Sequence, residues 1–245
     1  HQGRLQGGSS VAEVQVIALG GSLLRPEEEE GRQIWFSRLK QMIVHLEGLE
    51  DKIGIVVGGG APAREGIALA RGHVNDERRL DEIGIAATRI NATIIQQVLA
   101  QVGIDVAPDI PHSVNEGAQL LREHAVVCMG GTLPGHTTDA VAVALAAEAG
   151  GSGCIIATNV PYVYDSDPRI NPDAQYHEFL SLEQLATICG VGEPLAAGAS
   201  AVVDPVAVQR AMDDSLGLAI LDGREMDRLE NAILGLEFEG TMVTP

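Results

Sequence analysis

The chain has 245 residues, with 34 acidic against 16 basic side chains and a net charge of −18. The acidic excess argues against duplex nucleic acid or an anionic membrane as a partner, because both are bound through basic surfaces. No apolar run approaches the roughly 20 residues that span a bilayer, and nothing resembles a cleavable signal. We therefore expect a cytoplasmic protein, built as one large α/β domain or two closely joined lobes.

Strand-like and helix-like segments alternate along the chain after residues 1–10, which lack apolar periodicity and are interpreted as a flexible arm or a cloning remnant. The predicted strands are 14–19, 53–57, 104–107, 125–128, 153–157 and 216–221. The predicted helices are 32–47, 62–71, 80–101, 115–122, 138–149, 181–188, 205–214 and 224–234. This alternation predicts an α/β fold, a three-layer αβα sandwich whose central sheet is mainly parallel.

Several local features refine these elements. Asp204 followed by Pro205 is typical of an N-cap and a first helical position. The acidic run 27–30 is interpreted as a solvated loop, and the glycines at 150–153 as the place where two lobes meet. In helix 80–101, five apolar residues fall near one stripe: Ile83, Ala87, Ile90, Ile94 and Leu99.

Three cysteines, Cys128, Cys154 and Cys189, are widely spaced and contain no C-x-x-C pair. Cys128 and Cys154 lie in or beside apolar strand-like runs, which favours buried free thiols. The odd number of cysteines suits a reducing compartment.

A glycine-rich turn follows each of three predicted strands. The turns are Gly20-Gly21-Ser22, then Gly58-Gly59-Gly60 with Arg64 one helical turn later, and the long segment 129–140. Glycine lets a backbone approach a ligand closely, and a helix N-terminus favours an anion. One such turn often only reverses the chain, but three at strand ends predict a phosphorylated ligand. Neither a Walker A pattern nor G-x-G-x-x-G is present.

Several anion-binding turns in one sheet suggest more than one phosphate group, and hence phosphoryl transfer. This reaction needs alignment and charge stabilisation more than covalent chemistry from the protein. Backbone donors at Gly20, Gly21, Gly59 and Gly60 could surround the moving group, with Arg64 holding phosphate oxygens. The alternative for Arg64 is an arginine on a helix surface.

Three further features concern the bound molecules. Segment 158–169 combines amide, aromatic and carboxylate groups that could bracket a purine and its ribose, although it could also be a surface loop. Asp81 could cap the long helix or accept hydrogen bonds from ribose hydroxyls. His136 is interpreted as a loop contact, because a phosphate acceptor is already ionised and needs no general base.

At these residues the chain resembles the archaeal-type uridylate (UMP) kinases of the amino acid kinase family. The resemblance covers roughly 14–245, in order. The corresponding segments are Leu19–Ser22, Val56–Gly60 with Ala63-Arg64, Asp81–Ile85 with Thr88–Ala92, Gly130–Ala140, Asn159–Pro168, Ala197–Ser200 with Val203–Pro205, and Gly240–Val243.

The resemblance implies an amino acid kinase fold over 11–245, with 11–150 holding UMP and 151–245 holding ATP. It implies the reaction of UMP with ATP and Mg²⁺ to give UDP and ADP, in an assembly that is a homohexamer built from dimers. The residues implied for UMP are Gly59, Asp81, Thr132, Leu133, Pro134, Gly135, His136, Thr137 and Thr138. Those implied for ATP are Gly20, Gly21, Ser22, Gly60, Arg64, Asn159, Tyr164 and Asp167, of which Arg64, Gly20 and Gly60 are also the catalytic candidates.

The chain departs from the family at two places. Many members have a lysine two residues before the first glycine turn, where this chain has Ala18, so backbone N–H groups, Mg²⁺ and Arg64 must carry more of the charge stabilisation. Pro161-Tyr162 replaces a common Asp-Gly and adds bulk to the ATP-side loop. These departures leave two alternatives open, a kinase for another small acceptor and a non-catalytic protein that binds a nucleotide or an oxyanion.

Overall fold

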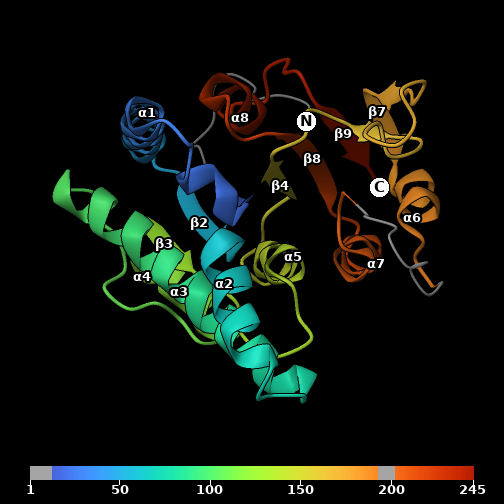
Figure 1. The fold of residues 1–245 in the computed structure, drawn as a ribbon. Helices are drawn as coiled ribbons and strands as arrows, with labels where there is room; N and C mark the ends of the chain where they lie inside the picture. Colours follow the sequence, from blue (N-terminus) through green and yellow to red (C-terminus); the bar gives the residue numbers. More distant parts are fainter. Residues whose placement is uncertain (1–12, 193–201) are drawn as a thin grey trace.

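A seven-stranded sheet forms the centre of the computed structural model, which describes residues 13–192 and 202–245 (Figure 1). The strand order is β3-β2-β1-β4-β8-β9-β7, and the first five strands are parallel. Strand β9 runs antiparallel to β8, and β7 is parallel to β9. The strands of this sheet are β1 Val14–Leu19, β2 Lys52–Val57, β3 Val126–Met129, β4 Gly153–Thr158, β7 Phe179–Ser181, β8 Gly217–Asp222 and β9 Thr241–Thr244.

Helices cover both faces of the sheet, which confirms the predicted three-layer sandwich with a mainly parallel sheet (Figure 1). Helices α4 to α7 pack on one face, and α1, α3 and α8 pack on the other. All eight predicted helices are confirmed. They are α1 Glu29–Gly48, α2 Gly60–Arg71, α3 Glu77–Gln101, α4 Val114–Glu123, α5 Thr138–Glu148, α6 Leu182–Cys189, α7 Pro205–Asp213 and α8 Met226–Ile233.

The central strands are apolar along both faces because both faces are buried. In β1, Val16 and Ala18 belong to the core on the α5 side, whereas Ile17 and Leu19 belong to the core on the α1 side. Because β1, β2, β3 and β4 are parallel, their carboxyl ends lie at one edge of the sheet, where the glycine turns begin.

The predicted strand 104–107 is wrong. This segment makes only one parallel bridge, between Val106 and Val126 at the β3 edge. Asp105 explains why no regular strand forms here. Its carboxylate accepts from Ala125 N (3.1 Å) and contacts the His124 ring, and these side-chain contacts replace regular backbone pairing with β3. Four short strands were not predicted: β5 Val163–Tyr164, β6 Tyr176–His177, β7 and β9. The two or three residues of β5, β6 and β7 are too few for a periodic pattern.

The apolar stripe proposed for α3 does not coincide with its buried face. Ile90 and Ile94 are 57% and 37% exposed, whereas the polar Thr88 and Asn91 are buried. Ala87 and Leu99 of the stripe are buried, so the stripe is correct only in part. The pattern fails where polar side chains of α3 contact the glycine turns and take positions on the buried face.

The helix termini correct two further interpretations and confirm a third. The run 27–30 is not entirely a loop, because Glu29 and Glu30 form the first turn of α1, where the helix dipole favours acidic residues. Asp81 does not cap the long helix; Asp76 does, accepting from Arg78 N (2.9 Å). Asp204 is confirmed as the N-cap of α7.

The three cysteines are buried and free, which confirms the prediction for Cys128 and Cys154. Burial raises the pKa of Cys128 to about 12, and it also raises the pKa of Cys154 and of Cys189. Thiols with raised pKa values are unreactive at neutral pH. None of the helices in 13–192 and 202–245 has the length and apolarity that a membrane span requires. The arm 1–10 and the motif 197–200 lie outside the described residues.

Candidate functional site

The first two glycine turns pack directly against each other, backbone on backbone. A Cβ added to Gly21 would lie 2.4 Å from Gly60 N and 2.6 Å from Gly58 O. Gly60 begins α2 with a φ of +59°, in the left-handed region that only glycine adopts without strain. The turns also continue the sheet, since Gly58 N donates to Leu19 O (2.8 Å) and Gly20 N donates to Ala157 O (3.0 Å). Glycine is therefore required by the contact itself.

The third glycine turn packs on α3. A Cβ on Gly130 would lie 2.4 Å from Thr88 Oγ1, and Gly131 N donates to that oxygen (2.7 Å). The Thr88 hydroxyl in turn donates to Ile85 O (2.6 Å). Helix α3 thus holds the start of the loop that leads to α5.

Thr137 ends this loop as the N-cap of α5. Its side-chain oxygen accepts from Ala140 N (3.2 Å), and its hydroxyl donates to Asp204 Oδ2 (2.5 Å). Thr137 and Thr138 both line the cavity in front of the loop, so the positive end of the α5 dipole lies at its edge.

A cavity of about 430 Å³ lies between α2, α3 and this loop. That volume suits a small-molecule site. Asp81 Oδ2 accepts from Gly135 N (3.0 Å) across the cavity, so the carboxylate also orders the loop. The predicted residues that line it are Gly59, Gly60, Arg64, Asp81, Leu133, Pro134, Gly135, His136, Thr137 and Thr138. Thr132 is not among the lining residues.

The residues predicted to bind ATP do not line one common cavity. Ser22 and Asn159 line a second cavity of about 610 Å³, which also contains Arg25, Arg38 and Arg224. Tyr164 lies in the two-stranded β5–β6 hairpin, and the Asp167 carboxylate is bound to Arg169 (2.9 Å). Neither Tyr164 nor Asp167 lines these two cavities.

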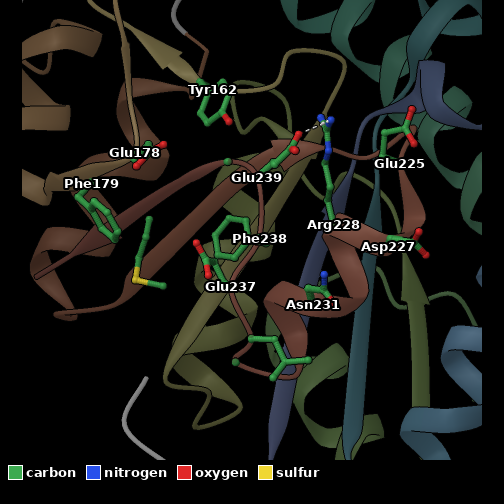
Figure 2. A pocket seen from close by; sticks show the side chains of 14 residues that line it. Tyr162, Glu178, Phe179, Glu225, Asp227, Arg228, Asn231, Glu237, Phe238 and Glu239 are labelled. Carbon is green, nitrogen blue, oxygen red and sulfur yellow. Dashed lines mark ion pairs between the residues drawn. The ribbon is translucent and has the colours of Figure 1, made fainter.

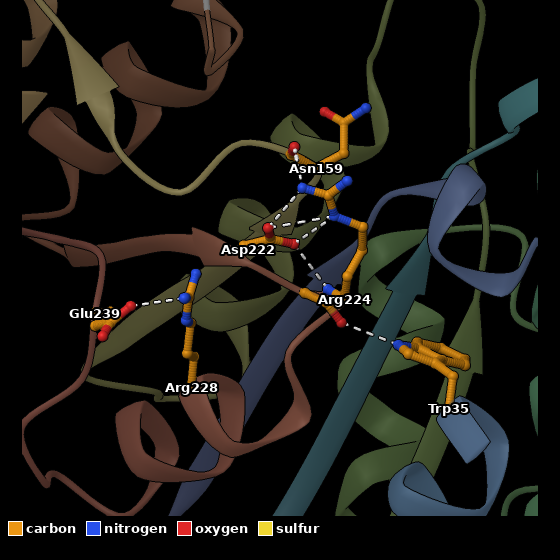
Figure 3. Close-up of polar contacts among 7 residues, drawn as sticks. Trp35, Asn159, Asp222, Arg224, Arg228 and Glu239 are labelled. Carbon is orange, nitrogen blue, oxygen red and sulfur yellow. Dashed lines mark hydrogen bonds and ion pairs between the residues drawn. The ribbon is translucent and has the colours of Figure 1, made fainter. Parts of the chain in front are cut away.

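The Asn159 loop is held by an ion pair that was not predicted (Figure 3). Arg224 Nη2 donates to Asp222 Oδ2 (2.8 Å) and to Asn159 O (3.2 Å). Burial alone would raise the pKa of Asp222, but the hydrogen bonds and charge of Arg224 outweigh it, so the pKa is lowered. Trp35 Nε1 donates to Gly223 O (2.9 Å), which anchors the same turn to α1.

Tyr162, one of the departures from the family pattern, turns away from this loop. Its ring stacks on Tyr176 of β6 with centroids 4.4 Å apart, and it lines a different cavity of about 640 Å³ (Figure 2). That cavity is unsuited to a phosphorylated ligand. Its one arginine, Arg228, is paired with Glu239 (2.6 Å). Four more carboxylates line the cavity: Glu178, Glu225, Asp227 and Glu237.

Three polar residues that support the site were not assigned roles from the sequence: Thr88, Asn91 and Arg25. Thr88 and Asn91 stood only as matched positions in a motif. The available signal was their position inside a predicted helix, where a polar side chain that is buried must find a partner. Nothing in the sequence indicated a role for Arg25, because no motif or periodic pattern includes this residue.

Asp139, at the start of α5, has a raised pKa that should make the stability of the protein depend on pH. Burial raises its pKa to about 6, the charge of Asp204 adds to the increase, and a backbone hydrogen bond from Asp204 offsets part of it. Between its ordinary value of 3.8 and about 6, the folded state keeps a proton that the unfolded state releases. The contribution of Asp139 to stability is therefore greatest below this window and is lost as pH rises through it.

We expect Asp139→Asn to abolish this pH dependence. The free energy of unfolding of the wild type, minus that of the variant, should fall as pH rises from about 4 to about 6. Urea unfolding at several pH values measures the difference. A difference that stays constant across the window would show that Asp139 ionises normally.

The chain is similar in sequence and in fold to known proteins. Residues 13–222 match the model of the amino acid kinase family. A uridylate kinase from Methanoregula boonei is 36% identical over 94% of both chains, and one from Methanococcus maripaludis is 35% identical over 94% of this chain and 99% of its own. The crystal structure of uridylate kinase from Archaeoglobus fulgidus has a TM-score of 0.80 and 33% identity, covering 95% of this chain and 100% of that one.

These relatives are archaeal proteins that match almost the whole chain, and their names agree with the resemblance carried by the glycine turns. The family model spans β1 to β8, and so contains both cavities' glycine turns. The chain therefore belongs to the amino acid kinase family.

Proposed function

We propose that this protein is a UMP kinase, which transfers the γ-phosphoryl group of ATP to UMP and gives UDP and ADP. One observation carries the proposal. The cavity of about 430 Å³ places Arg64, two glycine turns and the N-terminus of α5 around one space, with Asp81 at its side. Among the described residues, none forms a hydrogen bond or an ion pair with the Arg64 side chain. The archaeal relatives named uridylate kinase support UMP as the acceptor.

The acceptor cavity suits a nucleoside monophosphate. Arg64 and the first turn of α5 would hold the phosphate, because both attract anions. Asp81 would accept from the ribose hydroxyls, opposite the phosphate end. No general base is needed, since an ionised oxygen of UMP attacks the γ-phosphorus as the bond to the ADP oxygen breaks.

Backbone N–H groups at Gly21, Ser22 and Gly60 would stabilise the transferring group, since this chain has Ala18 in place of a strand lysine. The N–H of Gly20, also predicted as a donor, is not available, because it donates to Ala157 O (3.0 Å). Mg²⁺ fits this arrangement as a companion of the ATP phosphates. The described residues contain no group of three or more His, Cys, Asp or Glu side chains that could hold a metal, and Mg²⁺ is commonly held largely by substrate phosphates and water. When bound, it would neutralise phosphate charge.

We also propose the division of labour at about residue 150. The acceptor cavity is lined entirely by residues between 59 and 138, which supports the first half of this division. The second cavity combines residues between 22 and 38 with Asn159 and residues 224–227, so the ATP side would draw on both halves of the chain. The three buried free thiols support a reducing compartment, the cytoplasm.

We propose a homohexamer as the assembly. The outward face of α3 supports self-association, because it exposes Ile90 and Ile94 beside Val98 over a shallow apolar surface. Exposed apolar faces of this kind commonly mark protein contacts.

The test is product formation. The protein should convert UMP to UDP with ATP and Mg²⁺, faster than it converts CMP, AMP or GMP. Turnover of a different acceptor in place of UMP would replace the proposal with another kinase activity. Binding of UMP and ATP without turnover would identify a non-catalytic nucleotide-binding protein.

We expect Asp81→Ala to raise the KM for UMP by about tenfold to a hundredfold while the KM for ATP changes little. The variant loses the acceptor for ribose and the hydrogen bond to Gly135 N. Initial-rate kinetics with each substrate varied separately measure the split. Glu82→Ala, at the exposed neighbouring position, is the control. Equal changes in both KM values would contradict the ribose role.

A further inference from the structure

Arg25 joins the two glycine turns through a bridge of hydrogen bonds. It follows the short 3-10 helix Gly21–Leu24 and turns its guanidinium back toward that segment. Nη1 donates to Gly21 O (2.8 Å), in the first turn, and Nη2 donates to Asn91 Oδ1 (2.5 Å), on α3. One planar fork therefore contacts Gly21, close to it in sequence, and Asn91, which is 66 residues away along the chain.

Asn91 completes the bridge to the second turn. Its side chain is fully buried, and Nδ2 donates to Gly58 O (2.6 Å) and Gly59 O (3.1 Å). The amide can take only one orientation here, because its NH₂ group faces two carbonyl oxygens and its oxygen faces a guanidinium. The carbonyl groups of both turns are thus tied to one Arg25–Asn91 pair.

The bridge sets the direction of the N–H groups. In a planar trans peptide, the carbonyl of one residue points opposite to the N–H of the next. Holding the carbonyls of Gly21, Gly58 and Gly59 on the α3 side therefore turns the N–H groups of Ser22, Gly59 and Gly60 to the other side. No hydrogen bond within 13–192 and 202–245 occupies these three donors.

Arg25 differs from the two other arginines of its cavity in its pairing. Arg38 and Arg224 line the same cavity but pair with Asp227 and Asp222, whereas Arg25 pairs with no carboxylate among the described residues. In a chain with a net charge of −18, this places a positive charge beside the turn where the strand lysine of many family members is replaced by Ala18.

We propose that Arg25 is a positioning residue for phosphoryl transfer, which holds the donor and acceptor glycine turns in one geometry through Asn91. The kinetic part of this inference rests on the proposed UMP kinase activity; the structural part does not. Alignment of the reacting groups dominates the rate of phosphoryl transfer, so a small displacement of one turn lowers kcat.

The test compares Arg25→Ala with Arg32→Ala. Arg32 is the matched control, because it also forks onto two backbone carbonyls, those of Pro26 and Glu27 (2.6 and 2.8 Å), but lies on the surface outside both cavities. Arg25→Ala should lower kcat about tenfold to a hundredfold, with both KM values changed less than about threefold. Arg25→Lys, which keeps the charge and a donor, should recover part of kcat. Arg32→Ala should match the wild type.

Amide hydrogen exchange of the free protein supplies a readout independent of activity. Arg25→Ala should speed exchange at the hydrogen-bonded amide of each turn, Gly20 N and Gly58 N, together, with Arg32→Ala unchanged. Unchanged exchange at either turn, or a rise in KM for ATP at constant kcat, would overturn the inference. If the wild type forms no UDP, the proposed function fails, and the exchange experiment still decides whether Arg25 couples the turns.

Discussion

Gly21→Ala should reduce kcat/KM by about a thousandfold or more. The added Cβ would lie 2.4 to 2.6 Å from backbone atoms of Gly58, Gly59 and Gly60. Backbone cannot rotate away as a flexible side chain can, so the two turns must separate. Separation displaces the donors on both sides of the transferring group, and a displacement of about 1 Å can cost a hundredfold by itself. Loss of the backbone stabilisation adds to this.

The same substitution should also lower the free energy of unfolding, by about 1–3 kcal/mol, as overpacked sites do. Gly20→Ala is the control for stability. Gly20 has a φ of −58°, and a Cβ there would meet only Ala157 O at 3.6 Å and the Leu23 side chain at 3.9 Å. Thermal unfolding of both variants, with kinetics of Gly21→Ala, measures the effects. Wild-type stability in Gly21→Ala would show that the turns are not in contact.

Arg64→Ala should lower kcat by between about a hundredfold and a thousandfold, the range found when one donor to developing charge is removed. Arg64 is exposed on the first turns of α2 and lines the acceptor cavity. No ion pair or hydrogen bond among the described residues engages its side chain, so its five donors are available to phosphate oxygens. The KM values should change much less than kcat.

Arg71→Ala is the matched control on the same helix, because Arg71 is exposed and pairs with Glu77 (2.9 Å) away from the cavity. Steady-state kinetics of both variants with UMP and ATP provide the comparison. A large rise in the KM for UMP at constant kcat would make Arg64 a residue for substrate binding alone.

Helix α3 connects these predictions. It carries Asp81 beside the acceptor loop, Thr88 under the third glycine turn and Asn91 under the second. Consecutive polar positions separated by three or four residues, or a multiple of them, lie along one side of a helix. A single rigid element thus positions two loops that approach from different strands, and through Arg25 it also holds the first glycine turn, which suits a reaction governed by alignment.

The order of the elements, the fold class and the locations of the glycine turns were predictable from the sequence. Each rests on a local signal: apolar periodicity for the eight helices, glycine after a strand for the turns, and an Asp-Pro pair for the start of α7. The gathering of Asp81, Arg64 and the loop 133–138 around one space followed from the resemblance, and the structure places them together.

Only the tertiary structure decided which polar residues hold that space. Arg25 contacts Asn91 across 66 residues, Asn91 contacts Gly58 across 33, and Thr88 contacts Gly131 across 43. No periodic pattern encodes such pairs. On α3, the polar Thr88 and Asn91 are buried, whereas Ile90 and Ile94 of the predicted apolar stripe are exposed. The sequence by itself determined where each turn lies. The packing of backbone on backbone at Gly21 and Gly60 determined how the turns face one another, because that contact exists only once separate strands are side by side.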